Sequence, residues 1–281
     1  MIPELPIDRF EVFATGLDHP ECVAFDREGC LWAGGEAGQV YCIDRAGKVE
    51  TIASLGGFTG GLAFSPNHEL FVCNPSLGIV RVRRDGKHEV FAADAARQPL
   101  VTPNFPAFDR AGNLYVTDSG NWKKRNGYLL RFDWTGNGIP VAGPFGYANG
   151  LALSADESRL FMVESDTNRV LVLDTEHFQT TVYAEQVGRL PDGLALDEAG
   201  NLYVSCYASD DIQRVAPDGK KTLFAHDPFA ILLSRPTNMA FDGEWMYIAN
   251  LGRTTITRAK VPVRGQKLVN SKFQIAADER R

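Results

Sequence analysis

The sequence predicts an all-β fold, a six-bladed β-propeller with four antiparallel strands in each blade. Three observations support this prediction. A short motif recurs six times at intervals of 39 to 45 residues, a period typical of propellers and other repeat architectures. Short apolar runs separated by turn residues follow each copy, as expected for the strands of a blade. A segment near the N-terminus supplies an outer strand that the last unit lacks.

The six copies of the motif each begin an apolar run with an alanine at the same place. They read PECVAFD (20–26), TGGLAFS (59–65), PNFPAFD (103–109), ANGLALS (148–154), PDGLALD (191–197) and PTNMAFD (236–242). A turn and a second apolar run follow each copy, so each pair is expected to form a β-hairpin. The second runs are 29–35, 69–74, 112–118, 159–165, 200–206 and 244–250.

Two further strands are expected to complete most units. The third strands are expected at 39–44, 79–84, 128–133, 169–174, 211–216 and 254–259. The fourth are expected at 48–53, 88–93, 138–143, 180–185 and 221–226. Four strands in 40 to 45 residues match the size of a propeller blade.

The sixth unit has no fourth strand after residue 260, and the N-terminus is expected to provide it. Residues 11–14 read EVFA, and so do residues 89–92 in the fourth strand of the second unit. We therefore expect residues 10–15 to pair beside 254–260, which closes the ring and removes an exposed sheet edge. Residues 1–281 are then expected to form a single propeller domain.

Composition and charge exclude several classes of function. The chain has a net charge of −6 and no basic run, which disfavours binding to nucleic acid or to anionic membranes. No apolar stretch approaches the ~20 residues of a membrane span, and the first residues do not resemble a secretory signal. Five cysteines without paired spacing argue against a disulfide framework or a thiolate zinc site. We expect a cytoplasmic monomer or homodimer.

The first strand of every blade lines the central channel of a propeller, so residues at one repeat position converge on the axis. The position three residues before the shared alanine is occupied by Glu21, Gly60, Asn104, Asn149, Asp192 and Thr237. The carboxylates and the two amides of this set are expected to form a ring at one mouth of the channel, because they share a register.

Such a ring is a candidate metal site. The carboxylates of Glu21 and Asp192 would repel each other unless a proton, water or a cation separates them. An all-oxygen set with Asn104 and Asn149 suits one hard divalent cation, Ca²⁺ ahead of Mg²⁺ or Mn²⁺, with Zn²⁺ and Fe²⁺ left open. The alternative is turn formation, since Asn, Asp and Gly commonly precede strands. Glu21 is a poor turn former, which favours the metal site.

These motifs resemble the regucalcin/gluconolactonase family, the senescence-marker-protein group whose neighbour is diisopropyl fluorophosphatase. Glu21 in HPECVAFD stands where that family has the metal-binding glutamate of a Glu-Gly-Pro motif, and Asn149 in ANGLALS matches its Asn-Gly asparagine. Asp192 in LPDGLALDEAGNLYVS matches the Pro-Asp-Gly aspartate, which is both ligand and catalytic group, and Asn104 matches a further asparagine that contacts metal or substrate. The resemblance covers essentially the whole chain and implies a metal-dependent lactonase.

The chain departs from the family pattern in the third repeat. Sugar lactonases of the family commonly have an arginine two residues before the asparagine, and here that place is Thr102. Asn104 is followed by Phe105 and Pro106 instead of Asp-Gly. A more apolar lactone or ester is therefore expected, with Phe105 forming part of the wall.

Further substrate contacts are expected from the ends of the second strands, which return to the same face. Asp118 ends one of them and begins a long loop, 118–127, in which Trp122 forms either a lid over the substrate or part of the rim. His19 precedes Glu21 by two residues and is either a proton relay or a hydrogen-bonded rim residue.

The sequence therefore predicts a metal-dependent hydrolase that opens a lactone, a small cyclic ester. Asp192 is expected to take a proton from the attacking water or to attack directly. Two alternatives remain open: hydrolysis of phosphotriesters or phosphofluoridates at the same metal, and a metal-binding scaffold without catalysis.

Overall fold

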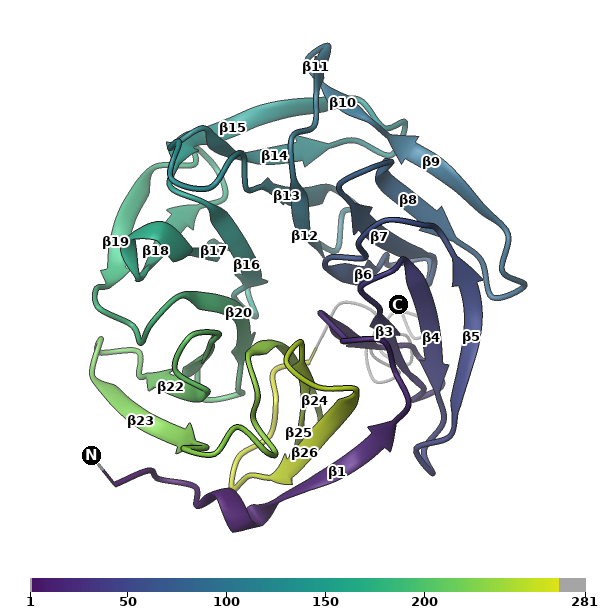
Figure 1. Ribbon diagram of the computed structural model, residues 1–281. Coiled ribbons are helices and arrows are strands. Elements are labelled where there is room, and N and C mark those ends of the chain that lie inside the picture. Colours follow the sequence, from purple (N-terminus) through teal and green to yellow (C-terminus); the bar gives the residue numbers. More distant parts are fainter. Residues whose placement is uncertain (1, 268–281) are drawn as a thin grey trace, which may run out of the picture.

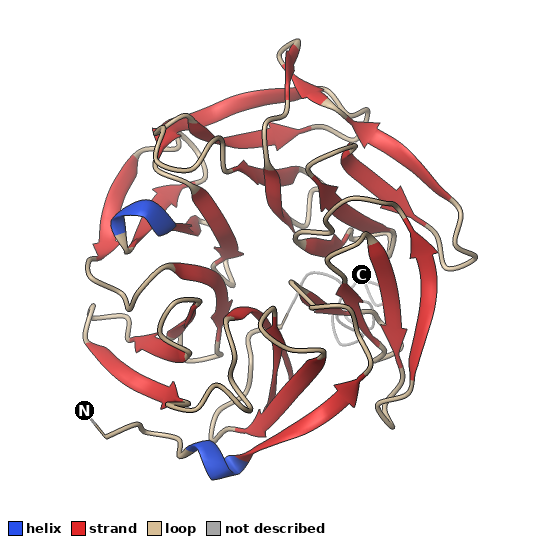
Figure 2. Ribbon diagram, in the orientation of Figure 1, coloured by secondary structure: helices blue, strands red, loops and turns tan. Residues whose placement is uncertain are grey.

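The fold is a six-bladed β-propeller, as the sequence predicts. The computed structural model describes residues 2–267. Six four-stranded antiparallel sheets surround a central axis (Figure 1). Strands and the loops between them make up nearly all of the ribbon, and the two helical segments are single short turns (Figure 2).

The first three blades follow one another along the chain from the innermost strand outward. Blade 1 contains β2 (Val23–Phe25), β3 (Leu31–Gly34), β4 (Gln39–Ile43) and β5 (Val49–Ser54). Blade 2 contains β6 (Leu62–Phe64), β7 (Leu70–Asn74), β8 (Gly78–Val82) and β9 (His88–Ala92). Blade 3 contains β12 (Pro103–Phe108), β13 (Leu114–Asp118), β14 (Gly127–Phe132) and β15 (Gly138–Phe145).

The last three blades repeat this order. Blade 4 contains β16 (Ala148–Leu153), β17 (Arg159–Glu164), β18 (Arg169–Asp174) and β19 (Thr180–Ala184). Blade 5 contains β20 (Pro191–Leu196), β21 (Leu202–Cys206), β22 (Asp211–Val215) and β23 (Lys221–His226). Blade 6 contains β24 (Pro236–Asp242), β25 (Trp245–Asn250), β26 (Thr255–Lys260) and, as its outer strand, β1 (Phe10–Thr15).

The pairing of β1 with β26 confirms the predicted closure of the ring. The two strands are antiparallel, with Phe10 opposite Ala259 and Thr15 opposite Thr255. Phe10 and Ala14 are buried in the two apolar clusters on either side of blade 6. The strand thus covers an open sheet edge and fills the core at the same time.

The apolar core lies between neighbouring blades. The second strands β7, β13 and β21 are buried along their whole length, because each sheet is covered on both faces by the adjacent blades. This burial explains the continuous apolar runs in the sequence. Among the described residues no helix is long and apolar enough to cross a membrane, and all five cysteines are free.

Small additional elements lie outside the blades. A short hairpin, β10 (Asp94–Ala95) with β11 (Gln98–Pro99), projects between blades 2 and 3 at the top of Figure 1. The 3-10 helix η1 (Ile7–Arg9) precedes β1, and η2 (Ser165–Thr167) follows β17. The innermost strands all begin at one face, and this places their first residues around one mouth of the channel.

Candidate metal and substrate site

The four expected ligand residues line one cavity at the mouth where the innermost strands begin. Glu21, Asn104, Asn149 and Asp192 come from four different blades, and the cavity has a volume of about 570 Å³. Thr237, the equivalent residue of blade 6, does not line this cavity; its hydroxyl donates a 2.6 Å hydrogen bond to the Glu21 carbonyl. The shared repeat position therefore does bring the carboxylate and amide side chains together.

Breaks in strand register occur at the ring position in blades 3 to 6. The pairing of β12 with β13 shifts between Pro103 and Phe105, so that Asn104 is the additional residue of a β-bulge. Equivalent shifts follow Ala148, Pro191 and Pro236. Because a bulge re-aims the side chain that it carries, these irregularities help to direct Asn104, Asn149 and Asp192 into the cavity.

One oxygen of each ring side chain is buried without a hydrogen-bond partner among the described residues. These atoms are Glu21 Oε2, Asn104 Oδ1, Asn149 Oδ1 and Asp192 Oδ1. Buried polar atoms nearly always have a partner, and each exception requires an explanation. Four converging oxygens, two of them from carboxylates, form the donor set that hard divalent cations prefer. The residues present therefore fit a divalent cation.

Ser165 fixes the orientation of Asn149, a role that the sequence analysis missed. The Asn149 amide donates from Nδ2 to Ser165 Oγ at 3.2 Å, and Ser165 Oγ donates to the Pro191 carbonyl at 2.7 Å. Because its nitrogen is held in this way, the amide presents Oδ1 to the cavity. The same hydroxyl ties blade 4 to blade 5 beside Asp192, so it supports two ring residues at once.

The two carboxylates lie in an environment that disfavours their charged forms. Burial raises the pKa of Glu21 well above its ordinary value, and the negative charge of Asp192 raises it further. Burial also raises the pKa of Asp192, although a hydrogen bond with Asn149 opposes the shift. A cation between the two carboxylates would reverse this preference.

Hydrogen bonds join neighbouring blades at the same height along the channel as the ring residues. In each of five blade pairs a backbone N–H or a hydroxyl of one blade donates to a carbonyl at the start of the next innermost strand. The pairs are Gly61 N to Asn104 O (2.6 Å), Ser119 Oγ to Ala148 O (2.6 Å), Ser165 Oγ to Pro191 O (2.7 Å), Ser205 Oγ to Thr237 O, and Thr237 Oγ1 to Glu21 O (2.6 Å).

Glycines after the ring residues permit this close approach. A Cβ on Gly150 would lie 2.5 Å from the Asp192 carbonyl oxygen, and one on Gly193 would lie 2.4 Å from the Thr237 carbonyl oxygen. Neither glycine has a positive φ, so each is required for contact with the next blade. The PDG segment thus begins strand β20 rather than forming a turn.

Aromatic and aliphatic side chains form most of the wall above the ring. Trp122 lines the cavity and packs edge-to-face on Tyr147 with ring centroids 5.0 Å apart. Phe58, Leu190 and Tyr207 line other parts of the wall. The cavity is therefore polar at the ring and largely apolar around its mouth.

A sequence profile described as the SMP-30/gluconolactonase/LRE-like region matches residues 20–251. The chain belongs to this family. The matched range begins one residue before Glu21 and ends one residue after the second strand of blade 6, and so includes all four ring residues.

Curated relatives of the chain include enzymes with two kinds of name. Diisopropyl-fluorophosphatase from Loligo vulgaris is 26% identical over 238 residues, which cover 74% of each chain. Lactonase drp35 from Staphylococcus saprophyticus is 26% identical over 246 residues, covering 79% of this chain and 74% of the relative.

Solved structures of a gluconolactonase and of a regucalcin share the propeller fold. A gluconolactonase from Xanthomonas campestris superposes with a TM-score of 0.79 at 20% identity, covering 90% of this chain and 89% of that one. A calcium-binding regucalcin from Agrobacterium tumefaciens superposes with a TM-score of 0.77 at 15% identity, covering 95% and 97%. At these identities the likeness establishes the fold.

The structure corrects the expectation for Phe105. Its side chain lies among the residues that line a second cavity toward the other end of the channel, and it packs on apolar clusters between the blades. The register break at Asn104 explains this, because Phe105 resumes the regular pairing opposite Thr117 and turns away from the mouth. Phe105 is not part of the wall above the ring.

The structure also corrects the expectation for Asp118. Its Oδ2 accepts a hydrogen bond from the Val101 N–H at 2.8 Å, and its Oδ1 accepts from the Thr102 and Gly120 N–H groups at 2.7 and 3.2 Å. The carboxylate is buried and does not line the cavity. Asp118 therefore holds the loop that precedes β12, and Thr102 of that loop faces the cavity in its place.

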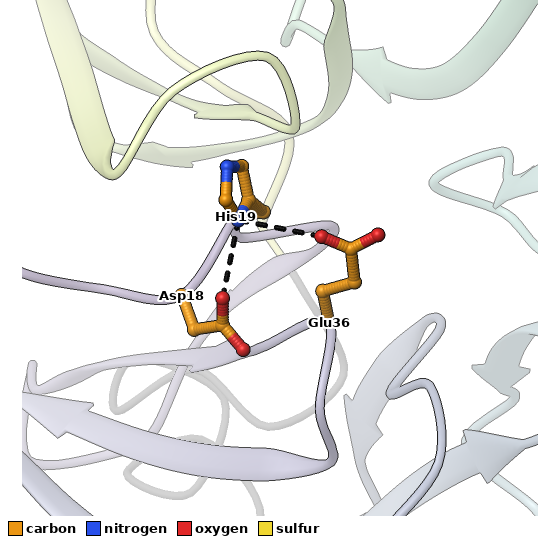
Figure 3. A group of neighbouring side chains, drawn as sticks. All are labelled: Asp18, His19 and Glu36. Atoms are coloured by element: carbon orange, nitrogen blue, oxygen red, sulfur yellow. Dashed lines mark hydrogen bonds and ion pairs between the residues drawn. The ribbon is translucent and has the colours of Figure 1, made fainter.

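His19 lies on the rim, outside the residues that line the cavity. Figure 3 shows its Nδ1 between Asp18 Oδ1 and Glu36 Oε2, at 3.1 and 3.3 Å. All three side chains are at least one-third exposed to solvent. His19 is therefore hydrogen-bonded outside the cavity lining, and a part in proton transfer stays a prediction.

Proposed function

We propose that this protein is a metal-dependent hydrolase that opens a lactone at a divalent cation, with Ca²⁺ preferred. The observation that carries the proposal is the convergence of four buried oxygens without partners, from Glu21, Asn104, Asn149 and Asp192. The lactonase and gluconolactonase names of several relatives support the reaction class.

The four ring residues would contribute to cation binding in different ways. Glu21 and Asp192 would hold the cation by charge, and the amide oxygens of Asn104 and Asn149 would complete the protein ligands. When bound, the cation would supply Lewis acidity toward the ester carbonyl. Ser165 keeps the Asn149 amide from rotating, so that its oxygen and not its nitrogen faces the site.

Asp192 is the proposed catalytic residue. In one route its carboxylate takes a proton from the water that attacks the ester carbon, the ring C–O bond breaks, and the proton is delivered to the departing alkoxide. In the other route the carboxylate attacks the carbonyl carbon, the ring C–O bond breaks with protonation of the departing alkoxide, and water hydrolyses the resulting mixed anhydride to restore Asp192. Both routes yield the open hydroxy acid.

Hydrolysis of phosphofluoridates or phosphotriesters is the second candidate function. The observation that favours it is the 26% identity to diisopropyl-fluorophosphatase over 74% of each chain. The same ligands and the same apolar wall could accept an organophosphate, since a phosphoryl oxygen can replace a carbonyl oxygen at a Lewis acid.

Metal analysis combined with two substrate panels tests these proposals. Purified protein is assayed on lactones and on organophosphates, as isolated, after chelation, and after addition of Ca²⁺, Mg²⁺, Mn²⁺, Zn²⁺ or Fe²⁺. We expect one equivalent of metal and lactone opening that is lost on chelation and restored by Ca²⁺. Turnover restricted to organophosphates would favour the second candidate. Bound metal without turnover on either panel would indicate a binding scaffold.

A further inference from the structure

The cavity above the ring offers apolar surface and no side-chain cation. Of the lining residues that the structure describes, Glu21 and Asp192 carry the charges, and none is lysine, arginine or histidine. The wall above them includes Phe58, Trp122, Tyr147 and Leu190. A divalent cation would be balanced by the two carboxylates, so an anionic group on a substrate would find no partner in this wall.

Basic residues near the rim are directed elsewhere or do not line the cavity. Arg125 Nη1 lies 3.3 Å from Glu164 Oε1, and the guanidinium of Arg235 lies 5.5 Å from the centroid of the Tyr207 ring. Lys123, Lys124 and Arg189 are exposed and absent from the cavity lining. Their charges are screened by solvent and contribute little to binding inside the cavity.

Trp122 and Tyr147 form an aromatic corner that is already in place. Their rings meet edge-to-face at 80°. The buried Glu164 carboxylate holds both supporting segments, since its Oε1 accepts a 2.7 Å hydrogen bond from the Gly146 N–H and pairs with Arg125 of the loop that carries Trp122. Trp122 is nevertheless 43% exposed, so a large part of its face remains available to a ligand.

Polar groups able to satisfy a polyhydroxylated ligand are few. The Ser165 hydroxyl already accepts from Asn149 and donates to the Pro191 carbonyl. Apart from the ring, Thr102, the two tyrosines and the indole N–H of Trp122 remain as polar side-chain groups of the lining. A sugar lactone would bury several hydroxyl groups without partners, and each would cost binding free energy.

We infer that the substrate is an uncharged lactone with a flat apolar group, such as an aromatic ring, beside the ester. This inference rests on the proposed function and names the substrate class of the same site. The aromatic corner would hold the flat group while the ring residues face the ester carbonyl.

Binding of two unreactive lactams tests the inference apart from turnover. The probes are 6-phenyl-2-piperidinone and D-glucono-δ-lactam, six-membered rings that differ in their substituents and resist hydrolysis. Calorimetry is performed on Ca²⁺-loaded and on chelated protein. We expect the phenyl lactam to bind at least tenfold tighter than the sugar lactam, and Trp122→Ala to weaken its binding about tenfold. Trp122→Phe is expected to retain most of the affinity.

Trp134→Ala is the matched control. This tryptophan is 85% exposed in the turn between β14 and β15, so its removal should leave both affinities unchanged. Equal or tighter binding of the sugar lactam would overturn the inference, as would unaltered binding to Trp122→Ala. Selective lactam binding by a protein that opens no lactone would contradict the proposed function and leave the aromatic site standing. Lactone opening by a protein that binds the two lactams equally would support the proposed function and contradict the inferred substrate class.

Discussion

The two ends of the channel are built from the same six strands and differ in chemistry. At the mouth where the strands begin, the ring positions hold six residues of five kinds, and four of their side chains surround the candidate metal site. Three residues further along, every blade has alanine, and all six alanines line the second cavity. That cavity measures about 170 Å³, and its other lining residues are mostly apolar, including Phe25, Phe64 and Leu196.

This difference separates packing from function. Near the alanines each blade meets the same neighbours, so the same small residue fits in all six. Residues 264–267 cross this end of the channel, where the Gln266 N–H donates to the Leu196 carbonyl at 2.8 Å. At the ring position, by contrast, the residue differs between most of the blades. A symmetric fold that becomes asymmetric at one level is the pattern expected where ligands of different kinds are needed.

Loss of the closing strand would have the largest effect, because both ends of the channel depend on a closed circle of six blades. Deletion of residues 1–16 removes β1 and the buried side chains of Phe10 and Ala14. We expect the melting temperature to fall by at least about 10 °C, or folding to be lost. Glu11→Gln removes only an exposed pair with Arg258 and serves as the control. An unchanged melting temperature after the deletion would contradict the closure.

Asp192→Asn should separate catalysis from metal binding at the ring. The amide keeps an oxygen ligand of nearly the same size and removes the basic group. With saturating Ca²⁺ we expect kcat for lactone opening to fall by ~10²-fold or more, and Glu21→Gln to lose less under the same conditions. Asp218→Asn, on an exposed turn of the same blade, is the control. A wild-type rate for Asp192→Asn would make Asp192 a ligand alone.

Leu196→Ala should change the apolar end of the channel and leave the ring intact. Leu196 is buried between blades 4 and 5 and lines the second cavity. Removal of its side chain should lower the free energy of unfolding by about 2–4 kcal/mol in urea titrations. Calcium affinity should stay within about twofold of the wild type. A large loss of affinity would show that the two ends are coupled.

Asp227→Asn should give a smaller effect that depends on pH. Burial raises the pKa of Asp227, but hydrogen bonds from the N–H groups of Leu232, Leu233, Phe229 and Ile231 outweigh it, and the net pKa lies below the ordinary value. The carboxylate therefore stabilises the fold above about pH 4, and the contribution is lost as the pH falls through the lowered pKa.

Urea unfolding at two pH values measures this contribution. At pH 7 the Asp227→Asn variant should be less stable than the wild type by about 1–3 kcal/mol. At pH 3 the difference should shrink, because the wild-type carboxyl approaches protonation. Asp218→Asn should show little difference at either pH. A difference that grows toward low pH would have the wrong sign for a lowered pKa.

The repeats were sufficient to predict the blades, the closure and the members of the ring. Apolar periodicity reports which strands are buried, and equal spacing reports which residues share a level of the channel. The direction of the side chain after Asn104 could not be predicted, because the bulge depends on how β12 pairs with β13 and not on local sequence. Phe105 was misplaced for this reason.

The other feature that could not be predicted is the hydrogen bonding of side chains to the backbone of distant segments. An aspartate at the end of a second strand can face the site or bind backbone N–H groups, and Asp118 does the latter. The role of Ser165 could not be predicted from the sequence, because its hydroxyl bonds to Pro191 of the next blade, 26 positions further along the chain. Turn formation was the alternative for the ANG and PDG segments, whereas the structure shows that Gly150 and Gly193 make room for the next blade.

Calorimetric titration of metal-free protein with Ca²⁺ tests the central claim most directly, in the wild type and in Glu21→Gln beside the exposed control Glu50→Gln. Glu21→Gln removes one of the two carboxylate charges of the ring. We predict one binding site per chain in the wild type and in the control, and an affinity at least tenfold weaker in Glu21→Gln. Wild-type affinity in Glu21→Gln, or no binding to any of the three proteins, would contradict the assignment of the four oxygens to a cation.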